Sequence, residues 1–193
     1  MRKTKNIKDW KLNGVRSFLN YGFLQENIIL AGGSLRSLID PLEPIQDYDL
    51  FFLGENPLSL KEDIENKIKK LGGKKTFQCD LDELRSFTLH GMKIQLIETQ
   101  KKYSTPQELI LDFDINACVF AFHQGQLFFR KQSIKDIKKK HITINKVTYP
   151  IATLKRISKY QSKGYKITLA AAEFVKQVAE NSLDMDLERV YID

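Results

Sequence analysis

Two aspartates, Asp47 and Asp49, form the group in this sequence that is best suited to catalysis. They stand two positions apart inside an apolar run, residues 46–54, that has the composition of a strand. Alternate side chains of a strand point to the same face, so we expect both carboxylates to project together while Tyr48 and Leu50 face the core. Adjacent carboxylates repel each other, and Mg²⁺ is held by one or two carboxylates together with substrate phosphates. The pair predicts a divalent metal site; the alternative is a solubilising pair on an edge strand.

A glycine-rich turn, Gly32-Gly33-Ser34, precedes these aspartates. It ends a short apolar run, residues 27–33, and opens a helical segment, residues 34–39. The glycines let backbone amides approach a phosphate closely, the serine hydroxyl adds a donor, and a helix N-terminus favours negative charge. The turn is therefore a candidate phosphate-binding site, although a turn of this kind can also serve only to reverse the chain.

Positive charge is concentrated in one part of the chain. The net charge is +7, and residues 131–166 contain 11 Lys or Arg against one acid, Asp136, a local balance of +10. By subtraction (7 − 10) the rest of the chain carries about −3. Clustered lysines release counterions when they neutralise phosphates, so this block favours a polyanionic partner such as nucleic acid. A solvated basic face is the alternative.

Several classes of protein are excluded by what the sequence contains. Its apolar runs are far shorter than the roughly 20 residues of a membrane span, and residues 1–5 lack a signal-peptide pattern. Cys79 and Cys118 form no CxxC motif, and three scattered histidines leave no His/Cys zinc site. We therefore expect a soluble cytoplasmic protein of a reducing compartment, without a membrane partner.

Strands and helices are expected to alternate in the first two thirds of the chain. The expected strand regions are 27–33, 46–54, 75–79, a hairpin within 86–99 that turns at His90-Gly91, and a hairpin within 114–130 that turns at Gln124-Gly125-Gln126. The expected helices are 9–21, 34–39, 59–71, a short one opening at Thr105, 151–162 and 168–181. Residues 1–130 form the predicted mixed α+β part, and residues 131–193 a basic, mostly helical C-terminal extension with a β excursion at 141–150.

Two of these helices carry capping-box patterns at their beginnings. Ser59 with Glu62 predicts the start of the first, and Thr105 with Glu108, with a proline between them, predicts the start of the second. The first is expected to end at Gly72-Gly73.

The order strand, Gly-Gly-Ser, helix, strand with Asp-x-Asp resembles the nucleotidyltransferase fold of DNA polymerase beta, poly(A) polymerases and CCA-adding enzymes. The run AGGSLRSLI…QDYDLFF is similar to the GGxVRD…DxDxxF opening of the CCA-adding and poly(A) polymerase head. Later segments resemble small viral and phage-encoded members: KIQLI (93–97), TPQE (105–108), FDINAC (113–118) and RISKYQSKGY (156–165). The resemblance covers about residues 27–166. It implies a mixed sheet flanked by helices.

The same resemblance implies a chemistry for the first part of the chain. Gly32, Gly33, Ser34 and Arg36 would hold the triphosphate of an NTP, and Asp47 with Asp49 would bind Mg²⁺ (or Mn²⁺). An acceptor hydroxyl would attack the α-phosphate in line, with pyrophosphate as the leaving group. The expected acceptor is an RNA 3′ end.

One position departs from the pattern of the family. Many members place a third carboxylate on a neighbouring strand, where this sequence has Gln95, and glutamine is a poor Mg²⁺ ligand. Asp114 is the first candidate for a replacing third carboxylate, because it begins an apolar run where a charge needs a reason to exist. Asp112 is the second, because LDFDINA also resembles the RRDFTINA run of CCA-adding enzymes, which would align Asp112 and Asn116.

A basic stripe follows on the helix predicted at 151–162. The stripe lies near Tyr160 and Tyr165, which offer stacking surfaces for bases, and it is the candidate RNA-binding surface. Its members are Lys155, Arg156, Lys159 and Lys163.

Two other functions fit the same residues. One is a small-molecule or protein nucleotidyltransferase, of the toxin–antitoxin or antibiotic-modifying type, and the other is a catalytically silent nucleotide- or RNA-binding module. About 60 residues follow the expected head, too few for the parts of a CCA-adding enzyme that measure and hold tRNA. Turnover of labelled NTP with Mg²⁺ and RNA separates the three functions. The sequence assigns no oligomeric state.

Overall fold

The computed structural model describes residues 15–54, 57–79 and 83–180. A seven-stranded mixed sheet forms its centre, in the order β3-β4-β5-β2-β1-β6-β7. Only β2 and β5 run parallel among these neighbours; the other pairs are antiparallel. The strands are β1 (Ile28–Ala31), β2 (Tyr48–Phe52), β3 (Lys74–Gln78), β4 (Leu84–Leu89), β5 (Met92–Ile97), β6 (Phe120–His123) and β7 (Gln126–Phe129).

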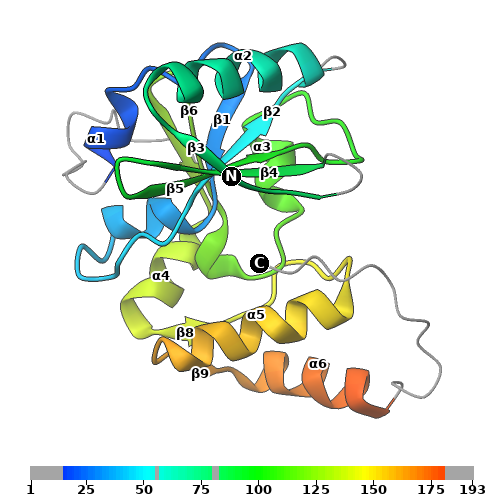
Figure 1. The fold of residues 1–193 in the computed structure, drawn as a ribbon. Helices are drawn as coiled ribbons and strands as arrows, with labels where there is room; N and C mark the ends of the chain where they lie inside the picture. Colours follow the sequence, from blue (N-terminus) through cyan, green and yellow to red (C-terminus); the bar gives the residue numbers. More distant parts are fainter. Residues whose placement is uncertain (1–14, 55–56, 80–82, 181–193) are drawn as a thin grey trace.

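Helices lie on both sides of this sheet. In Figure 1, α2 lies above the sheet and α4, α5 and α6 lie below it, together with a two-stranded parallel sheet of β8 and β9. The helices are α1 (Arg16–Leu19), α2 (Pro57–Lys70), α3 (Pro106–Leu111), α4 (Lys131–Lys139), α5 (Pro150–Ser162) and α6 (Leu169–Glu180). The 3-10 helices are η3 (Gly33–Leu38) and η4 (Asn116–Cys118), and the short strands are β8 (His141–Ile142) and β9 (Lys166–Ile167). The α+β architecture predicted from the sequence is confirmed.

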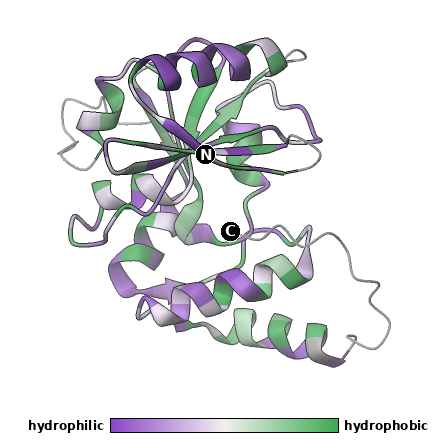
Figure 2. Ribbon diagram, in the orientation of Figure 1, coloured by the Kyte–Doolittle hydropathy of each residue, from purple (hydrophilic) through white to green (hydrophobic). Residues whose placement is uncertain are grey.

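Each face of the sheet has its own apolar cluster. Ile28 and Leu30 face the larger cluster, which α2 covers, and Ile29 with Ala31 face the smaller one, which α3 covers. Figure 2 shows hydrophobic residues in the central strands and a hydrophilic outer surface on α2. The larger cluster continues through Ile157, so the buried core does not end at residue 130, where the sequence predicts a boundary.

The turns that join the strands follow the sequence prediction. His90 and Gly91 both have positive φ between β4 and β5, and Gln124 and Gly125 do so between β6 and β7. Two adjacent residues with positive φ match the twist of antiparallel strands, which is why a glycine stands second in each turn.

Three predicted helices differ in detail from the observed ones. The helix predicted at 34–39 is the 3-10 helix η3 (Gly33–Leu38) and not an α-helix. Helix α2 begins at Pro57, so Ser59 lies inside it and the predicted Ser59–Glu62 capping box is wrong. The helix predicted at 9–21 lies partly outside the described residues, and its described part is α1.

Other helix ends match their predictions. Thr105 caps α3 and its hydroxyl accepts a hydrogen bond from the Glu108 backbone at 3.2 Å. Helix α2 ends at the expected glycines: Gly72 has φ +85°, and the Gly73 amide donates to the Ile68 carbonyl at 2.9 Å. Among the described residues, no helix has the length and apolarity needed to cross a membrane.

Candidate nucleotide-binding site

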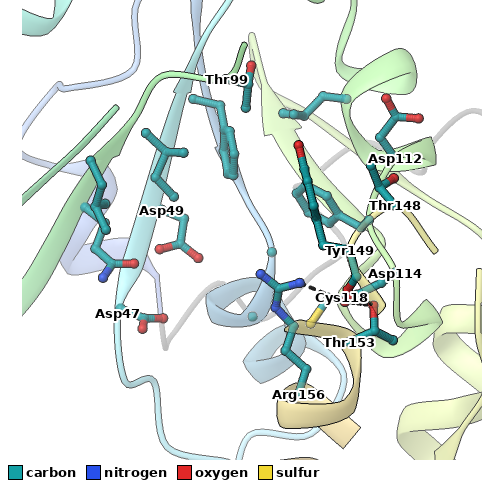
Figure 3. Close-up of a pocket in the computed structure, with 18 of the residues that line it drawn as sticks. Asp47, Asp49, Thr99, Asp112, Asp114, Cys118, Thr148, Tyr149, Thr153 and Arg156 are labelled. Atoms are coloured by element: carbon teal, nitrogen blue, oxygen red, sulfur yellow. Dashed lines mark hydrogen bonds and ion pairs between the residues drawn. The ribbon is translucent and has the colours of Figure 1, made fainter. Parts of the chain in front are cut away.

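A cavity of about 430 Å³ lies between the sheet and α5. Figure 3 shows Asp47 and Asp49 on one side of it, and Arg156 with Asp114 on the other. We call the first side the carboxylate wall, made of Gly32, Gly33, Asp47, Asp49 and Gln95, and the second side the basic wall, made of Arg156, Lys159 and Lys163. The two walls come from parts of the chain more than 60 residues apart.

The strand β2 presents the aspartates as its alternation predicts. Tyr48, Leu50 and Phe52 are buried in the core, whereas Asp49 is half-buried and lines the cavity. Asp47 lies immediately before the first residue of the strand and lines the cavity as well. The prediction that the two carboxylates share one face is confirmed, because both open onto the same space.

Gly32 leaves room for one of these carboxylates because it has no side chain. Its φ is +84°, and a Cβ at this position would lie 3.2 Å from Oδ2 of Asp49. Its amide donates to the Phe120 carbonyl at 3.0 Å, which fixes the turn against β6. A side chain at Gly32 would therefore crowd the aspartate and strain the backbone.

The remainder of the turn only partly matches the expected phosphate site. Gly33 lines the cavity, but Ser34 is buried and does not, so the serine hydroxyl is not brought to the cavity surface. Among the described residues, Ser34 Oγ has no hydrogen-bond partner. The helix that follows is a six-residue 3-10 helix, so the helix N-terminus expected from the sequence is a single short turn.

Arg36 lines the cavity from a buried position. Its guanidinium forms an ion pair with Glu43 at 2.9 Å and lies 4.7 Å from the ring centre of Tyr160 on α5. Its Nε has no hydrogen-bond partner within the described part of the chain. A buried cation that is held from behind and reaches a cavity is suited to an anionic ligand.

The basic wall comes from residues that the sequence assigned to RNA. Arg156, Lys159 and Lys163 line the cavity, whereas Lys155 is exposed and does not. The side chain of Lys163 is only 17% exposed, and burial together with the nearby Arg36 lowers the pKa of its ammonium group. Three of the four members of the predicted RNA stripe therefore face the space that the aspartates also face.

Both candidate third carboxylates, Asp112 and Asp114, line the same cavity as Asp47 and Asp49, but each is paired with cations. Asp114 is buried and accepts hydrogen bonds from Arg156 at 2.7 Å and from Thr153 at 3.0 Å. No group of three or more His, Cys, Asp or Glu side chains in the described ranges is arranged to hold a metal ion. The structure thus gives Asp114 a cationic partner on α5.

Asp112 is also occupied by cations. It pairs with Lys101 at 2.6 Å and with Lys146 at 2.5 Å, and it accepts a hydrogen bond from Tyr103. Burial by itself would raise the pKa of Asp112, but these three partners lower it to about 2.

Gln95 lies beside Asp49, as the resemblance implies. Strands β2 and β5 run parallel, and Asp49 and Gln95 are partners in their register. Gln95 is buried and lines the cavity. The resemblance implies a third carboxylate beside Asp49, and this chain has the amide of Gln95 there.

Sequence reasoning missed an aromatic part of the cavity. Phe51, Tyr103, Phe113 and Tyr149 all line it, and the rings of Phe51 and Phe113 are 5.7 Å apart. The sequence analysis did not assign a cavity role to these residues. The position of Phe51 two residues after Asp49 on the same strand was the available signal, because it places both side chains on one face.

Asp47 and Asp49 suit a divalent cation by their chemistry. Two carboxylates that open onto one cavity, opposite several cations, match the way Mg²⁺ is bound through one or two carboxylates and the phosphates of a substrate. The donor set is hard and anionic, which excludes metals that prefer thiolate or imidazole.

The chain matches a protein family in sequence and several solved structures in fold. A family model described as "Gad2: Gabija anti-defense 2 family protein" matches residues 3–140. No curated protein matches the sequence. Among solved structures, the Thermotoga maritima CCA-adding enzyme complexed with tRNA is similar at a TM-score of 0.69 and 18% identity, over 94% of this chain and 47% of that one.

Other solved structures give the same result. A CCA-adding enzyme in complex with ATP is similar at a TM-score of 0.71 and 19% identity, over 95% of this chain and 48% of that one. A tRNA-processing enzyme in its apo form is similar at 0.61 and 16% identity, over 94% and 50%. These likenesses show the nucleotidyltransferase fold, and this chain spans about half the length of those enzymes.

Proposed function

The chain belongs to the Gabija anti-defense 2 family, and we propose that it transfers a nucleoside monophosphate from an NTP to an acceptor hydroxyl. The observation that carries this proposal is the pairing of the two walls in one cavity. Asp47 and Asp49 face it from the sheet, and Arg156, Lys159 and Lys163 face it from α5. Carboxylates for a cation and cations for phosphates are the two requirements of nucleotidyl transfer.

The triphosphate is bound between the Gly32-Gly33 turn and α5. Lys159 and Lys163 neutralise phosphate oxygens from one side, while Arg36 reaches the cavity from behind the turn. Glu43 cancels only part of this positive charge, since its carboxylate lies 2.9 Å from Arg36 and 3.9 Å from Lys163. Lys140, 3.5 Å from Glu43, is itself paired with Asp40 at 2.7 Å. An anionic ligand completes the neutralisation of this cluster.

Asp47 and Asp49 would hold the metal ion, Mg²⁺ or Mn²⁺, which would supply charge stabilisation at the attacking and leaving oxygens. Arg156, oriented by its ion pair with Asp114, binds phosphate on the opposite side of the cavity from the aspartates. Phe51 and Phe113 form an apolar surface that excludes water from part of the same space.

The acceptor that we propose is an RNA 3′ end. CCA-adding enzymes of similar structure form complexes with tRNA, ATP and CTP. Helix α4 adds four exposed lysines outside the cavity lining, which suit a phosphate backbone. They are Lys131, Lys135, Lys138 and Lys139. The Gabija anti-defense description of the family supports the proposal that this transfer acts against the Gabija system.

Incubation of the full-length protein with each α-labelled NTP, Mg²⁺ and total RNA tests the proposal. We expect label on RNA with wild type and none with Asp49→Asn. Label on a small molecule or on protein would support the transfer reaction but would show that the acceptor is not RNA. No labelled product with any of these acceptors, under conditions in which the NTP is bound, would contradict the proposal.

A second function is favoured by one specific observation. Gln95 stands at the position of a third carboxylate, and Asp114 is paired with Arg156, so two carboxylates face the cavity from the sheet. A catalytically silent nucleotide-binding module would have this arrangement. It would bind a non-hydrolysable NTP analogue in a Mg²⁺-dependent manner and turn over none of the four NTPs.

A further inference from the structure

We propose that Gln95 is a positioning residue that holds Asp49 in the orientation needed to bind the cation. The inference rests on the proposed function, since it concerns the same metal site. It assigns a specific task to the residue that stands where many nucleotidyltransferases have a carboxylate. Gln95 acts through Asp49 and is not itself a metal ligand.

The first support is the register of the sheet. β2 and β5 are adjacent parallel strands, and Asp49 and Gln95 are partners across them. Both side chains line the same cavity, and Gln95 is 5% exposed. A side chain of this length, buried beside a carboxylate, has few orientations open to it.

The second support is the hydrogen bonding of the amide. With its nitrogen toward Asp49, Gln95 donates to Asp49 Oδ1 at 2.8 Å, and its oxygen accepts from Lys93 Nζ at 3.1 Å. The reversed amide would turn an oxygen toward the carboxylate and hydrogens toward the ammonium group. Lys93 and Asp49 together therefore determine the direction in which the amide points.

The third support is the packing on the other side of Asp49. Oδ2 lies 3.2 Å from the position that a Cβ on Gly32 would occupy, so Asp49 lies directly beside the turn in space that a side chain at position 32 would fill. Oδ1 is held by Gln95 and Oδ2 is bounded by Gly32. An aspartate limited on both sides loses rotamer freedom before the cation arrives, which raises its affinity for the cation.

A neutral donor also suits the electrostatics of this site. A carboxylate at position 95 would add a third negative charge beside Asp49, whereas an amide donates a hydrogen bond to it. Because the amide oxygen is directed to Lys93, it is turned away from Asp49. The cation is therefore held by the aspartates, and Gln95 contributes by orientation.

The test measures Mn²⁺ binding directly, by the electron paramagnetic resonance signal of free Mn²⁺, with and without a non-hydrolysable ATP analogue. Gln95→Met keeps the length of the side chain and removes the amide. We expect it to weaken Mn²⁺ binding roughly tenfold, the low end of the effect of removing a hydrogen-bond partner of a metal ligand. Gln78→Met is the matched control, since Gln78 also pairs with a lysine, Lys75, but on the exposed edge strand β3.

Lys93→Met separates positioning from simple electrostatics. Loss of a nearby positive charge would by itself strengthen the binding of a cation. If Lys93 orients the amide of Gln95, its removal weakens Mn²⁺ binding two- to threefold instead. Lys93 is exposed, so this variant tests the inference even if Gln95→Met destabilises the protein.

The outcomes separate the inference from the proposed function. Wild-type affinity in Gln95→Met, or tighter binding in Lys93→Met, would overturn the positioning role while the metal site stands. Absence of Mn²⁺ binding by the wild type, with the ATP analogue present, would overturn the metal site and the positioning role together. Weaker binding in both variants with an unchanged Gln78→Met control supports the positioning role.

Discussion

The two walls of the cavity differ in how the chain builds them. Four of the five residues of the carboxylate wall come from one short stretch, residues 32–49, and the fifth, Gln95, lies on the strand paired with β2. Strand β2 is hydrogen-bonded to a neighbour on each side. The basic wall comes from a helix about 100 residues later, and an ion pair between Arg156 and Asp114 connects it to the chain segment before β6. The first wall is determined by local alternation and the second by packing, so they should respond differently to substitution.

The largest effect is expected on the carboxylate wall. Asp47→Asn and Asp49→Asn should each lower nucleotidyl transfer at least about a hundredfold, or about 2.7 kcal/mol, because each removes a charged ligand of the cation. The fold should stay intact or become slightly more stable, since one of two repelling carboxylates is neutralised. Turnover of labelled NTP and thermal melting measure the two effects. Near-normal turnover in both variants would refute the nucleotidyltransferase function.

Substitutions in the basic wall should chiefly weaken the binding of the NTP substrate. The double substitution of Lys159 and Lys163 by alanine should reduce kcat/KM for NTP roughly thirtyfold, about 2 kcal/mol, chiefly through a higher KM. Lys155→Ala is the matched control, since Lys155 is exposed on the same helix and does not line the cavity. Equal effects of the double variant and the control would show that α5 acts only as a charged surface.

Loss of the ion pair between Arg156 and Asp114 should lower activity somewhat less. Asp114→Ala should lower activity at least roughly tenfold, about 1.4 kcal/mol, because Arg156 loses the partner that orients it. Asp112→Ala should lower it less, since Asp112 pairs with lysines at 101 and 146. Steady-state kinetics of both variants decide the order. The reverse order would favour the alignment of Asp112 with the CCA-adding enzymes.

Away from both walls, Glu65 should make stability depend on pH. Burial by itself raises its pKa, but Lys69, Lys75 and Arg85 lower it from 4.5 to about 2. A lowered folded-state pKa gives stability that is present above pH 4.5 and is lost as the pH falls toward about 2. We expect Glu65→Gln to lose on the order of 2 kcal/mol at pH 7, after solvent screening at Lys69, and to equal wild type near pH 2. Chemical unfolding over this range measures it, and parallel pH profiles would contradict it.

The smallest effect is expected on RNA binding. Replacement of three exposed lysines of α4, at 135, 138 and 139, should flatten the log–log salt dependence of RNA binding by about two units, at about 0.7 per phosphate contact. NTP binding should be unchanged, because none of the three lines the cavity. Fluorescence anisotropy of a labelled oligonucleotide over a salt series measures the slope. A slope equal to that of wild type would favour a small-molecule acceptor.

The sequence by itself determined the pair of aspartates in the carboxylate wall. Alternation in residues 46–54 placed Asp47 and Asp49 on one face, because neighbouring strand residues must point in opposite directions. Gly32 of the turn and the glycines of both hairpins could be predicted for the same kind of reason, since a positive φ selects glycine locally. The start of α2 could not be predicted in the same way. Ser59 matches a capping pattern, but it lies inside a helix that begins at Pro57.

Only the tertiary structure decided what the distant side chains face. The spacing of Arg156, Lys159 and Lys163 on α5 was visible in the sequence, but a stripe on a helix gives no direction until the helix is packed. Packing of Tyr160 against Arg36 and the pairing of Arg156 with Asp114 turn that stripe toward the cavity. Likewise, the partnership of Gln95 with Asp49 depends on the register of two strands and joins residues 46 positions apart (95 − 49). Local sequence encodes which face of an element a side chain occupies, whereas its neighbours depend on contacts between segments far apart in the chain.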